Sequence, residues 1–211
     1  GLKNTLREDA LYTVDKFKSM GVKVHMLTGD LRDNAVYTAT SLKLIAEGGK
    51  TITYLDFIDA DDGKVKIKEI LEKIRNSGEL KKRGASRAQS SVEGGLERLK
   101  TMSLDTTLKP NNSNAMTFVV SGRTMEIAKE DSYLENHLAF ILQYAVCIVG
   151  YEMKPNHKKE VLMTMKRCNQ GGMIMAIGDG YNDIPMLEFA NIGVQLALEQ
   201  SHLSYGDIMV K

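Results

Sequence analysis

Residues 173–187 read MIMAIGDGYNDIPML, an apolar run that breaks abruptly into two carboxylates and an amide. The segment 173–177 is apolar throughout, which is typical of a strand buried on both faces of a parallel sheet. Gly178 and Gly180 allow the backbone to turn tightly, and Pro185 is tolerated in the first turn of a helix. The stretch therefore predicts a strand, a tight turn and a helix, the repeating unit of an α/β fold.

Two carboxylates follow this predicted strand. Asp179 comes directly after it, and Asp183 lies one turn further on. Open α/β sheets bind their ligands at the carboxyl ends of their strands, so both side chains are expected to converge there. Mg²⁺ is usually held by one or two carboxylates together with phosphate and water. A turn that merely caps a helix is the alternative interpretation.

Strand and helix patterns alternate on both sides of a polar stretch. Before it, an apolar segment at 22–27 runs into Thr28, with helical spacing on either side. After it, strands are predicted at 116–122, 145–149 and 173–177. This order predicts a Rossmann-like parallel sheet with helices on both faces. The segments 22–27 and 173–177 are expected to lie in one sheet and to run parallel.

The polar stretch divides the chain into 1–46, an insertion at 47–115, and 116–211. A short strand at 51–57 and a helix after Gly63 are plausible within the insertion. The segment from Lys64 to Lys100 contains eleven Lys and Arg but only five Asp and Glu, a local excess of six positive charges. A solvated, partly disordered, basic insertion is expected, and contact with an acidic partner or anionic lipid headgroups is the alternative.

Composition excludes several classes of protein. The 211 residues carry a formal net charge of +1, which gives no global reason to expect a nucleic-acid partner. The two cysteines, Cys147 and Cys168, match no metal-binding spacing and indicate reduced thiols. No apolar run approaches the roughly 20 residues of a membrane-spanning helix. His157, in the first turn of a helix opened by Pro155, is expected to face solvent.

Three motifs follow successive predicted strands: Thr28-Gly29-Asp30, then Lys158, then the acidic turn at 178–183. Together they resemble the phosphorylation domain of P-type ATPases, members of the haloacid dehalogenase superfamily. Within this class the chain is most similar to the P4 group, the phospholipid flippases. The segment 118–124, which ends in Ser-Gly-Arg-Thr, is similar to a flippase strand that ends in Ser-Gly-Lys-Thr.

The resemblance assigns a role to each motif in phosphoryl transfer. Thr28 would offer a hydroxyl donor to the phosphoryl group and Lys158 a fixed positive charge, which makes both candidate catalytic residues. The residues implied to bind nucleotide or phosphate are Thr28, Gly29, Asp30, Lys158 and Asn182. The residues implied to bind Mg²⁺ are Asp179 and Asp183. ATP would be the substrate of the parent protein.

The nucleophile of the resembled family is missing. That family carries an aspartate in an Asp-Lys-Thr-Gly-Thr motif on a strand between the threonine-motif and acidic-motif strands, and no such sequence occurs here. The chain thus resembles the downstream part of a split domain. The isolated chain is expected to be inactive, with a gap in its sheet that favours marginal stability or self-association.

Several positions depart from the resembled pattern. Leu31 stands where a Lys commonly follows Thr-Gly-Asp, Asn34 replaces a later Thr, and Tyr181 replaces a small residue in the acidic motif. Glu152 stands where an Arg is usual, which reverses a charge near the nucleotide. These changes leave three hypotheses. The parent is an active P4-type pump, a weakened flippase-like regulatory module such as that of a guanylyl cyclase fusion, or a stand-alone phosphatase of the same superfamily.

The first hypothesis implies partners beyond this chain. They are the upstream nucleophile and nucleotide-binding segments, the transmembrane domain of the parent, phospholipid, and an accessory subunit. The chain would then be a cytoplasmic portion of a multi-pass membrane protein. A stand-alone phosphatase would instead need its own Asp-x-Asp nucleophile motif, which the sequence lacks.

Overall fold

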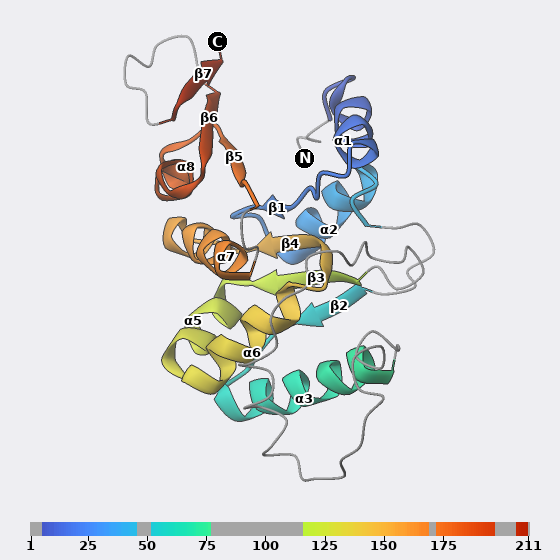
Figure 1. The fold of residues 1–211 in the computed structure, drawn as a ribbon, viewed down its shortest axis with the longest axis vertical. Helices are drawn as coiled ribbons and strands as arrows, with labels where there is room; N and C mark the ends of the chain where they lie inside the picture. Colours follow the sequence, from blue (N-terminus) through green and yellow to red (C-terminus); the bar gives the residue numbers. More distant parts are fainter. Residues whose placement is uncertain (1–5, 46–51, 77–115, 169–171, 197–205, 211) are drawn as a thin grey trace.

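The computed structural model describes residues 6–45, 52–76, 116–168, 172–196 and 206–210. Its strands form two separate parallel sheets, with the order β1-β4-β3-β2 in the larger and β5-β6-β7 in the smaller (Figure 1). Helices and strands alternate along the chain, so the predicted α/β class with parallel strands is confirmed. Within the described ranges, no helix is both long and apolar enough to cross a membrane.

The larger sheet is built from segments on both sides of the polar stretch. Its strands are β1 (Met26–Leu27), β2 (Ile52–Leu55), β3 (Met116–Ser121) and β4 (Ala145–Tyr151). The smaller sheet contains β5 (Met175–Gly178), β6 (Ile192–Leu196) and β7 (Ile208–Val210). The helices are α1 (Ala10–Ser19), α2 (Arg32–Ser41), α3 (Ala60–Asn76), α5 (Gly122–Glu130), α6 (Ser132–Leu142), α7 (Pro155–Cys168) and α8 (Ile184–Phe189), with a 3₁₀ turn at Tyr181–Asp183 before α8.

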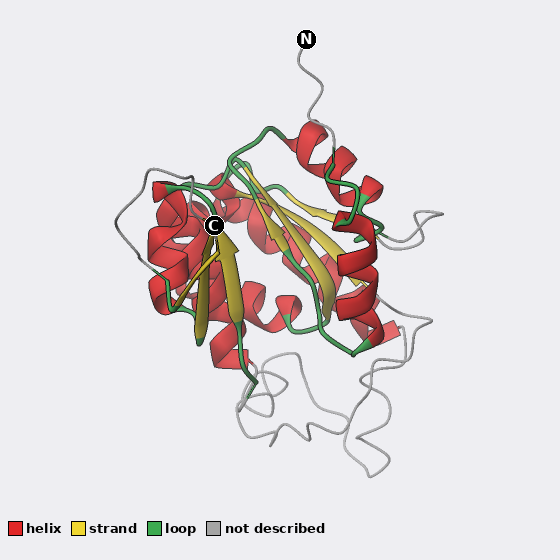
Figure 2. Cartoon of the chain, turned by 90° about the horizontal axis from the view of Figure 1, so that it is seen from above, coloured by secondary structure: helices red, strands yellow, loops and turns green. Residues whose placement is uncertain are grey.

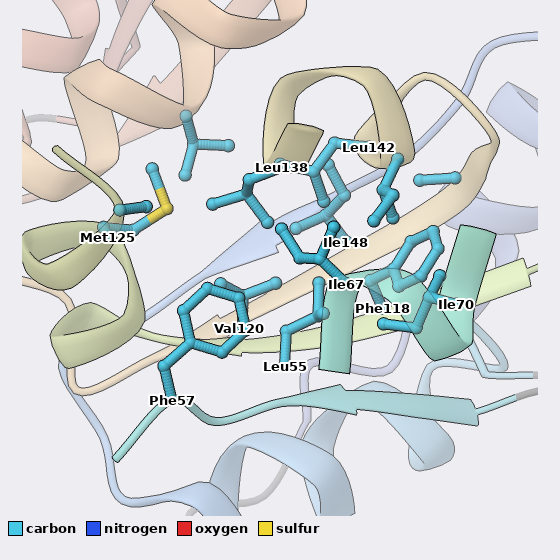
Figure 3. Close-up of a cluster of buried hydrophobic side chains, with 14 of the residues drawn as sticks. Leu55, Phe57, Ile67, Ile70, Phe118, Val120, Met125, Leu138, Leu142 and Ile148 are labelled. Atoms are coloured by element: carbon cyan, nitrogen blue, oxygen red, sulfur yellow. The ribbon is translucent and has the colours of Figure 1, made fainter. Parts of the chain in front are cut away.

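Each face of the larger sheet has its own apolar core. On one face, side chains of β2, β3 and β4 pack against α3, α5 and α6, with Phe118, Leu55 and Ile148 fully buried (Figure 3). On the other face, Val119 and Val149 pack against Ala35 and Ala39 of α2. Successive residues of β3 thus alternate between the two cores, and all six of its residues are buried. This explains why the segment reads as a continuous apolar run.

The first part of the predicted insertion at 47–115 is built into the larger sheet and its core. β2 pairs in parallel with β3, and α3 places Ile67, Ile70 and Ile74 in the core. These apolar residues recur at helical spacing, so burying them outweighs the polar character of the surrounding sequence. The remainder of the predicted insertion, 77–115, lies outside the described residues.

The expectation that the first and last predicted strands share a sheet is wrong. β1 pairs with β4 and β5 pairs with β6, so among the described strands both β1 and β5 are sheet edges. Leu27 of β1 nevertheless packs against both the main core and the cluster formed by Leu162, Ala176 and Leu187. The two sheets therefore adjoin at β1, but no described strand continues the hydrogen-bond ladder from one to the other (Figure 2).

β5 is half exposed, although its apolar sequence predicted burial on both faces. Ala176 faces α8 and is buried, whereas Met175 and Ile177 are 48% and 51% exposed. In register with them, the smaller sheet carries Ile192 and Val194 of β6. Among the described residues, a helix covers only the face of this sheet that packs against α8. The opposite face, which carries Met175 and Ile177, is apolar and accessible.

β1 is shorter than the predicted strand at 22–27. Its ladder with β4 begins only at Met26, and one residue earlier the His25 imidazole replaces the backbone, with Ile148 N–H donating to Nδ1 at 3.0 Å. Burial, and secondarily the charge of Lys23, lower the pKa of His25 to about 4. The neutral imidazole is therefore part of the fold.

Acidification is expected to destabilise the chain through His25. Since the pKa of His25 in the folded protein, about 4, lies below the ordinary histidine pKa of 6.5, the contribution of the neutral ring is complete above pH 6.5 and is lost as pH falls toward 4. The loss should reach about 2 to 3 kcal/mol by pH 4.5. Urea denaturation at pH 7 and 4.5 measures it against His25→Asn, whose amide oxygen can accept the same bond without titrating. An equal pH dependence in both proteins would contradict the assignment.

Candidate functional site

Thr28 lies where β1 ends, on a loop tied to the exit of β4. Its backbone N–H donates to Gly150 O at 2.9 Å, and its carbonyl accepts from Met153 N at 3.0 Å. Glu152 N–H donates to Asp30 O at 2.8 Å, and Glu152 adopts a positive φ of 49° to make this contact. The Thr28 loop is thus fixed by the segment that leads into α7.

Lys158 and Asp183 form a buried ion pair. Lys158 extends from the first turn of α7, and its Nζ lies 2.6 Å from Asp183 Oδ1. Only 3% of Lys158 and 6% of Asp183 are exposed. A buried ammonium and carboxylate are tolerated only when paired in this way. The pair joins α7 to the turn that follows β5, although the two residues are 25 positions apart.

The acidic turn folds around the side chain of Asp183. Asp179 N–H donates to Asp183 Oδ2 at 3.2 Å, so each oxygen of the Asp183 carboxylate has a partner. A Cβ atom on Gly178 would lie 2.4 Å from Asp183 Cβ, which shows why this position must be glycine. The Asp179 side chain is exposed beside this turn. The glycines of the motif therefore allow two carboxylates to occupy one turn.

The structure brings three of the predicted residues into direct contact: Lys158, Asp179 and Asp183. The side-chain oxygen of Thr28 instead accepts from Asp30 N at 3.1 Å, and the backbone of Thr28 is bonded to Gly150 and Met153, so these hydrogen bonds connect Thr28 to the β4 exit and not to the other three residues. The remaining predicted residues, Gly29, Asp30 and Asn182, are all exposed.

Two features of the site are not predicted by the sequence patterns. The β4 exit holds the Thr28 loop through the backbone of residues 152 and 153, which leaves no signal in side-chain patterns. His157, expected at the surface, is buried with 6% exposed and lies beside Glu126. Its position three residues after Lys154, at a helix start, is the signal that could have located it.

The carboxylates of Asp179 and Asp183 suit an Mg²⁺ ion whose other ligands are water and phosphate. The described residues contain no group of three or more His, Cys, Asp or Glu able to enclose a metal. Mg²⁺ needs only one or two carboxylates when water and phosphate complete its octahedral shell. Asp179 is exposed and could bind the ion directly, whereas Asp183, already bonded to Lys158, could orient the surrounding ligands.

A hollow of about 670 Å³ lies elsewhere, between α2 and β2. Arg32 and Tyr37 of α2 line it together with Tyr54 and Asp56. Asp56 accepts a hydrogen bond from the Tyr151 hydroxyl. The hollow contains none of the predicted site residues, so its size does not make it the candidate site.

Comparisons with known proteins agree with the motifs. The sequence pattern of haloacid dehalogenase-like hydrolases matches residues 161–202, which include the acidic turn. The human phospholipid-transporting ATPase VA is 25% identical over 201 residues, covering 93% of this chain and 12% of its own length. Yeast phospholipid-transporting ATPase DRS2 (Saccharomyces cerevisiae) is 22% identical over 196 residues, covering 93% and 12%. Probable phospholipid-transporting ATPase 4 of Arabidopsis thaliana is 25% identical over 196 residues, covering 93% and 14%.

The similarity extends along nearly the whole chain but over a small part of each relative. The chain spans between 12% and 14% of the length of these three relatives. Its parallel α/β fold and its acidic turn after β5 agree with the haloacid dehalogenase-like match. The resemblance is therefore confirmed: the chain is similar to a segment of the P4-type phospholipid-transporting ATPases and carries a haloacid dehalogenase-like region.

Proposed function

We propose that this chain is part of the phosphorylation domain of a P4-type ATPase that couples ATP hydrolysis to phospholipid translocation. The buried pair of Lys158 and Asp183, 2.6 Å apart beside the acidic turn, carries the proposal. An isolated buried pair contributes little net stability, so its presence beside a candidate phosphate site favours a functional role. The similarity to phospholipid-transporting ATPases supports the same assignment.

In the proposed site, Lys158 stabilises negative charge on a phosphoryl group. Asp183 holds the ammonium in place through Oδ1 and the backbone of the acidic turn through Oδ2. Thr28 contributes its hydroxyl from a loop fixed at both carbonyl and amide. Gly29, Asp30 and Asn182 are exposed and available to nucleotide or phosphate.

Asp179 would hold Mg²⁺, with Asp183 orienting the ligands around it. When bound, the ion would neutralise charge on the phosphate oxygens. This assignment rests on the two carboxylates of the acidic turn: Asp179 is exposed, and Asp183 is fixed by Lys158.

The break between the two sheets supports the view that the nucleophile lies on another segment. β1, which leads to Thr28, and β5, which leads to Asp179, are both edge strands among those described. A strand carrying the nucleophile aspartate would pair with both edges and place that aspartate between Thr28 and Asp179. The sequence contains no Asp-Lys-Thr-Gly-Thr motif to supply this strand itself.

The remaining parts of the machinery would belong to the parent protein. They are a nucleotide-binding segment for ATP, membrane-spanning helices for phospholipid, and an accessory subunit. The chain would then form a cytoplasmic part of a multi-pass membrane protein. The chain matches only 12% of the length of the human and yeast proteins, which is compatible with these parts lying elsewhere in a longer protein.

Calorimetric titration with Mg²⁺ tests the proposed metal residue. Asp179→Asn removes the exposed carboxylate without changing its shape, and Mg²⁺ affinity is expected to fall about tenfold or more. Asp61→Asn, which removes an exposed carboxylate on α3, is the matched control and should leave the affinity unchanged. Equal Mg²⁺ affinity in Asp179→Asn and wild type would remove Asp179 from this role.

A further inference from the structure

The first turn of α7 is held by an imidazole. α7 begins at Pro155, so Lys154 is the residue before the helix and His157 is the third helical residue. Lys154 N–H donates to His157 Nδ1 at 3.2 Å. In a capping box, a Glu or Gln at this third position accepts from the backbone N–H of the residue before the helix. His157 performs the same function with a ring nitrogen.

The other ring nitrogen connects α7 to α5. His157 Nε2 lies 3.2 Å from Glu126 Oε1, and Lys154 Nζ donates to the same oxygen at 2.6 Å. Because Nδ1 accepts the Lys154 N–H, the proton of the neutral ring must lie on Nε2 and point at Glu126. The hydrogen-bond network thus specifies one tautomer.

The imidazole fits only because α5 begins with glycine. A Cβ atom on Gly122 would lie 2.6 Å from His157 Nδ1 and 2.3 Å from Glu152 O. The His157 side chain is only 7% exposed, whereas Glu126 is 45% exposed. The ring is therefore packed between α5 and the start of α7.

We propose that His157 is a positioning residue that fixes the first turn of α7 so that Lys158 reaches Asp183. Lys158 is the next residue, and its backbone N–H donates to Lys154 O at 3.3 Å within the turn that His157 caps. Gly122, which lies against the His157 ring, also lies against the carbonyl of Glu152, and the backbone of Glu152 and Met153 holds the Thr28 loop. The catalytic meaning of this position rests on the proposed function, but the structural coupling does not.

Two substitutions of His157 distinguish the loss of the capping hydrogen bond from a change in side-chain volume. His157→Gln keeps an acceptor at the capping position, whereas His157→Leu fills a similar space without one. Hydrogen exchange in a peptide spanning 153–162 should be about fivefold faster in His157→Leu and near wild type in His157→Gln, because a lost cap weakens the helix start. Wild-type exchange in His157→Leu, or equal acceleration in both variants, overturns the proposal.

The tautomer gives a signature that general packing would not produce. Nitrogen-15 NMR of the imidazoles should show the proton of His157 on Nε2. His137 is the internal comparison, because its Nδ1 lies 2.7 Å from Tyr133 O and must carry the proton to donate to it. A His157 ring protonated on Nδ1 is incompatible with the capping contact and overturns the proposal.

The ammonium of Lys158 links capping to the candidate site. Buried in its pair with Asp183, it should give a slowly exchanging NMR signal that is retained in His157→Gln and lost in His157→Leu. Retention in His157→Leu would show that Lys158 does not depend on the cap. Binding of inorganic phosphate with Mg²⁺ is measured separately. Unchanged phosphate binding in Lys158→Ala would contradict the proposed function. The NMR signal of the Lys158 ammonium in the two His157 variants would still decide whether His157 positions Lys158.

Discussion

Replacing Asp183 by asparagine is expected to lower the free energy of unfolding by about 3 to 5 kcal/mol. The substitution keeps the shape of the side chain and an oxygen that can accept from Asp179 N–H. It removes the only charge that the structure pairs with Lys158 among the described residues, and that ammonium is 3% exposed. An uncompensated buried charge is among the costliest defects a fold can carry.

Urea denaturation of three variants resolves this effect. Asp183→Asn and Lys158→Met should each be strongly destabilised, because each leaves one buried charge alone. The double variant Lys158→Met with Asp183→Asn removes both charges and should be more stable than either single variant. Losses below about 1 kcal/mol in both single variants would indicate a solvated pair and contradict the burial that the site requires.

Replacing Thr124 by valine is expected to cost about 2 to 4 kcal/mol, although valine has nearly the same shape. The Thr124 hydroxyl is fully buried at the start of α5 and donates to Leu55 O at 2.6 Å. It also accepts from Phe57 N at 3.0 Å and lies 2.9 Å from Ser121 Oγ. Valine would leave the backbone groups of Leu55 and Phe57 buried without their partner.

Thr124→Ser is the matched control, because it keeps the hydroxyl and removes only a methyl group. It should cost about 1 kcal/mol, clearly less than valine. The free energy of unfolding of both variants, measured by urea denaturation, gives the comparison. If serine were the more damaging substitution, packing of the methyl group rather than hydrogen bonding would account for the contribution of Thr124 to stability, and the prediction would be wrong.

The acidic turn was predictable because its constraint is local. Gly178, Asp179 and Asp183 lie within six residues, and the clash that a Cβ on Gly178 would cause is set by the turn itself. Their contact with Lys158 depends on α7 packing beside α8, which no local pattern encodes. Only the resemblance of three separate motifs suggested that these residues meet.

The arrangement of the sheets was not predictable from periodicity. The apolar run at 173–177 indicates a strand, but its burial depends on the segments that cover it, and Ile177 is 51% exposed. The polar sequence around β2 and α3 predicts an insertion, yet the apolar residues of these two elements join the main core. His157 likewise looked like a surface residue, because a ring that caps a helix has no periodic signal.

Incubating the purified 211-residue chain with radiolabelled ATP and Mg²⁺ tests most directly whether its nucleophile lies on another segment. Circular dichroism and the Mg²⁺ titration first establish that the protein is folded and binds the ion. We expect no acid-stable phosphoprotein, because no aspartate in this chain occupies the nucleophile motif. An acid-stable, hydroxylamine-sensitive phosphoprotein would show that a carboxylate of this chain is itself phosphorylated, and would contradict the split-domain assignment.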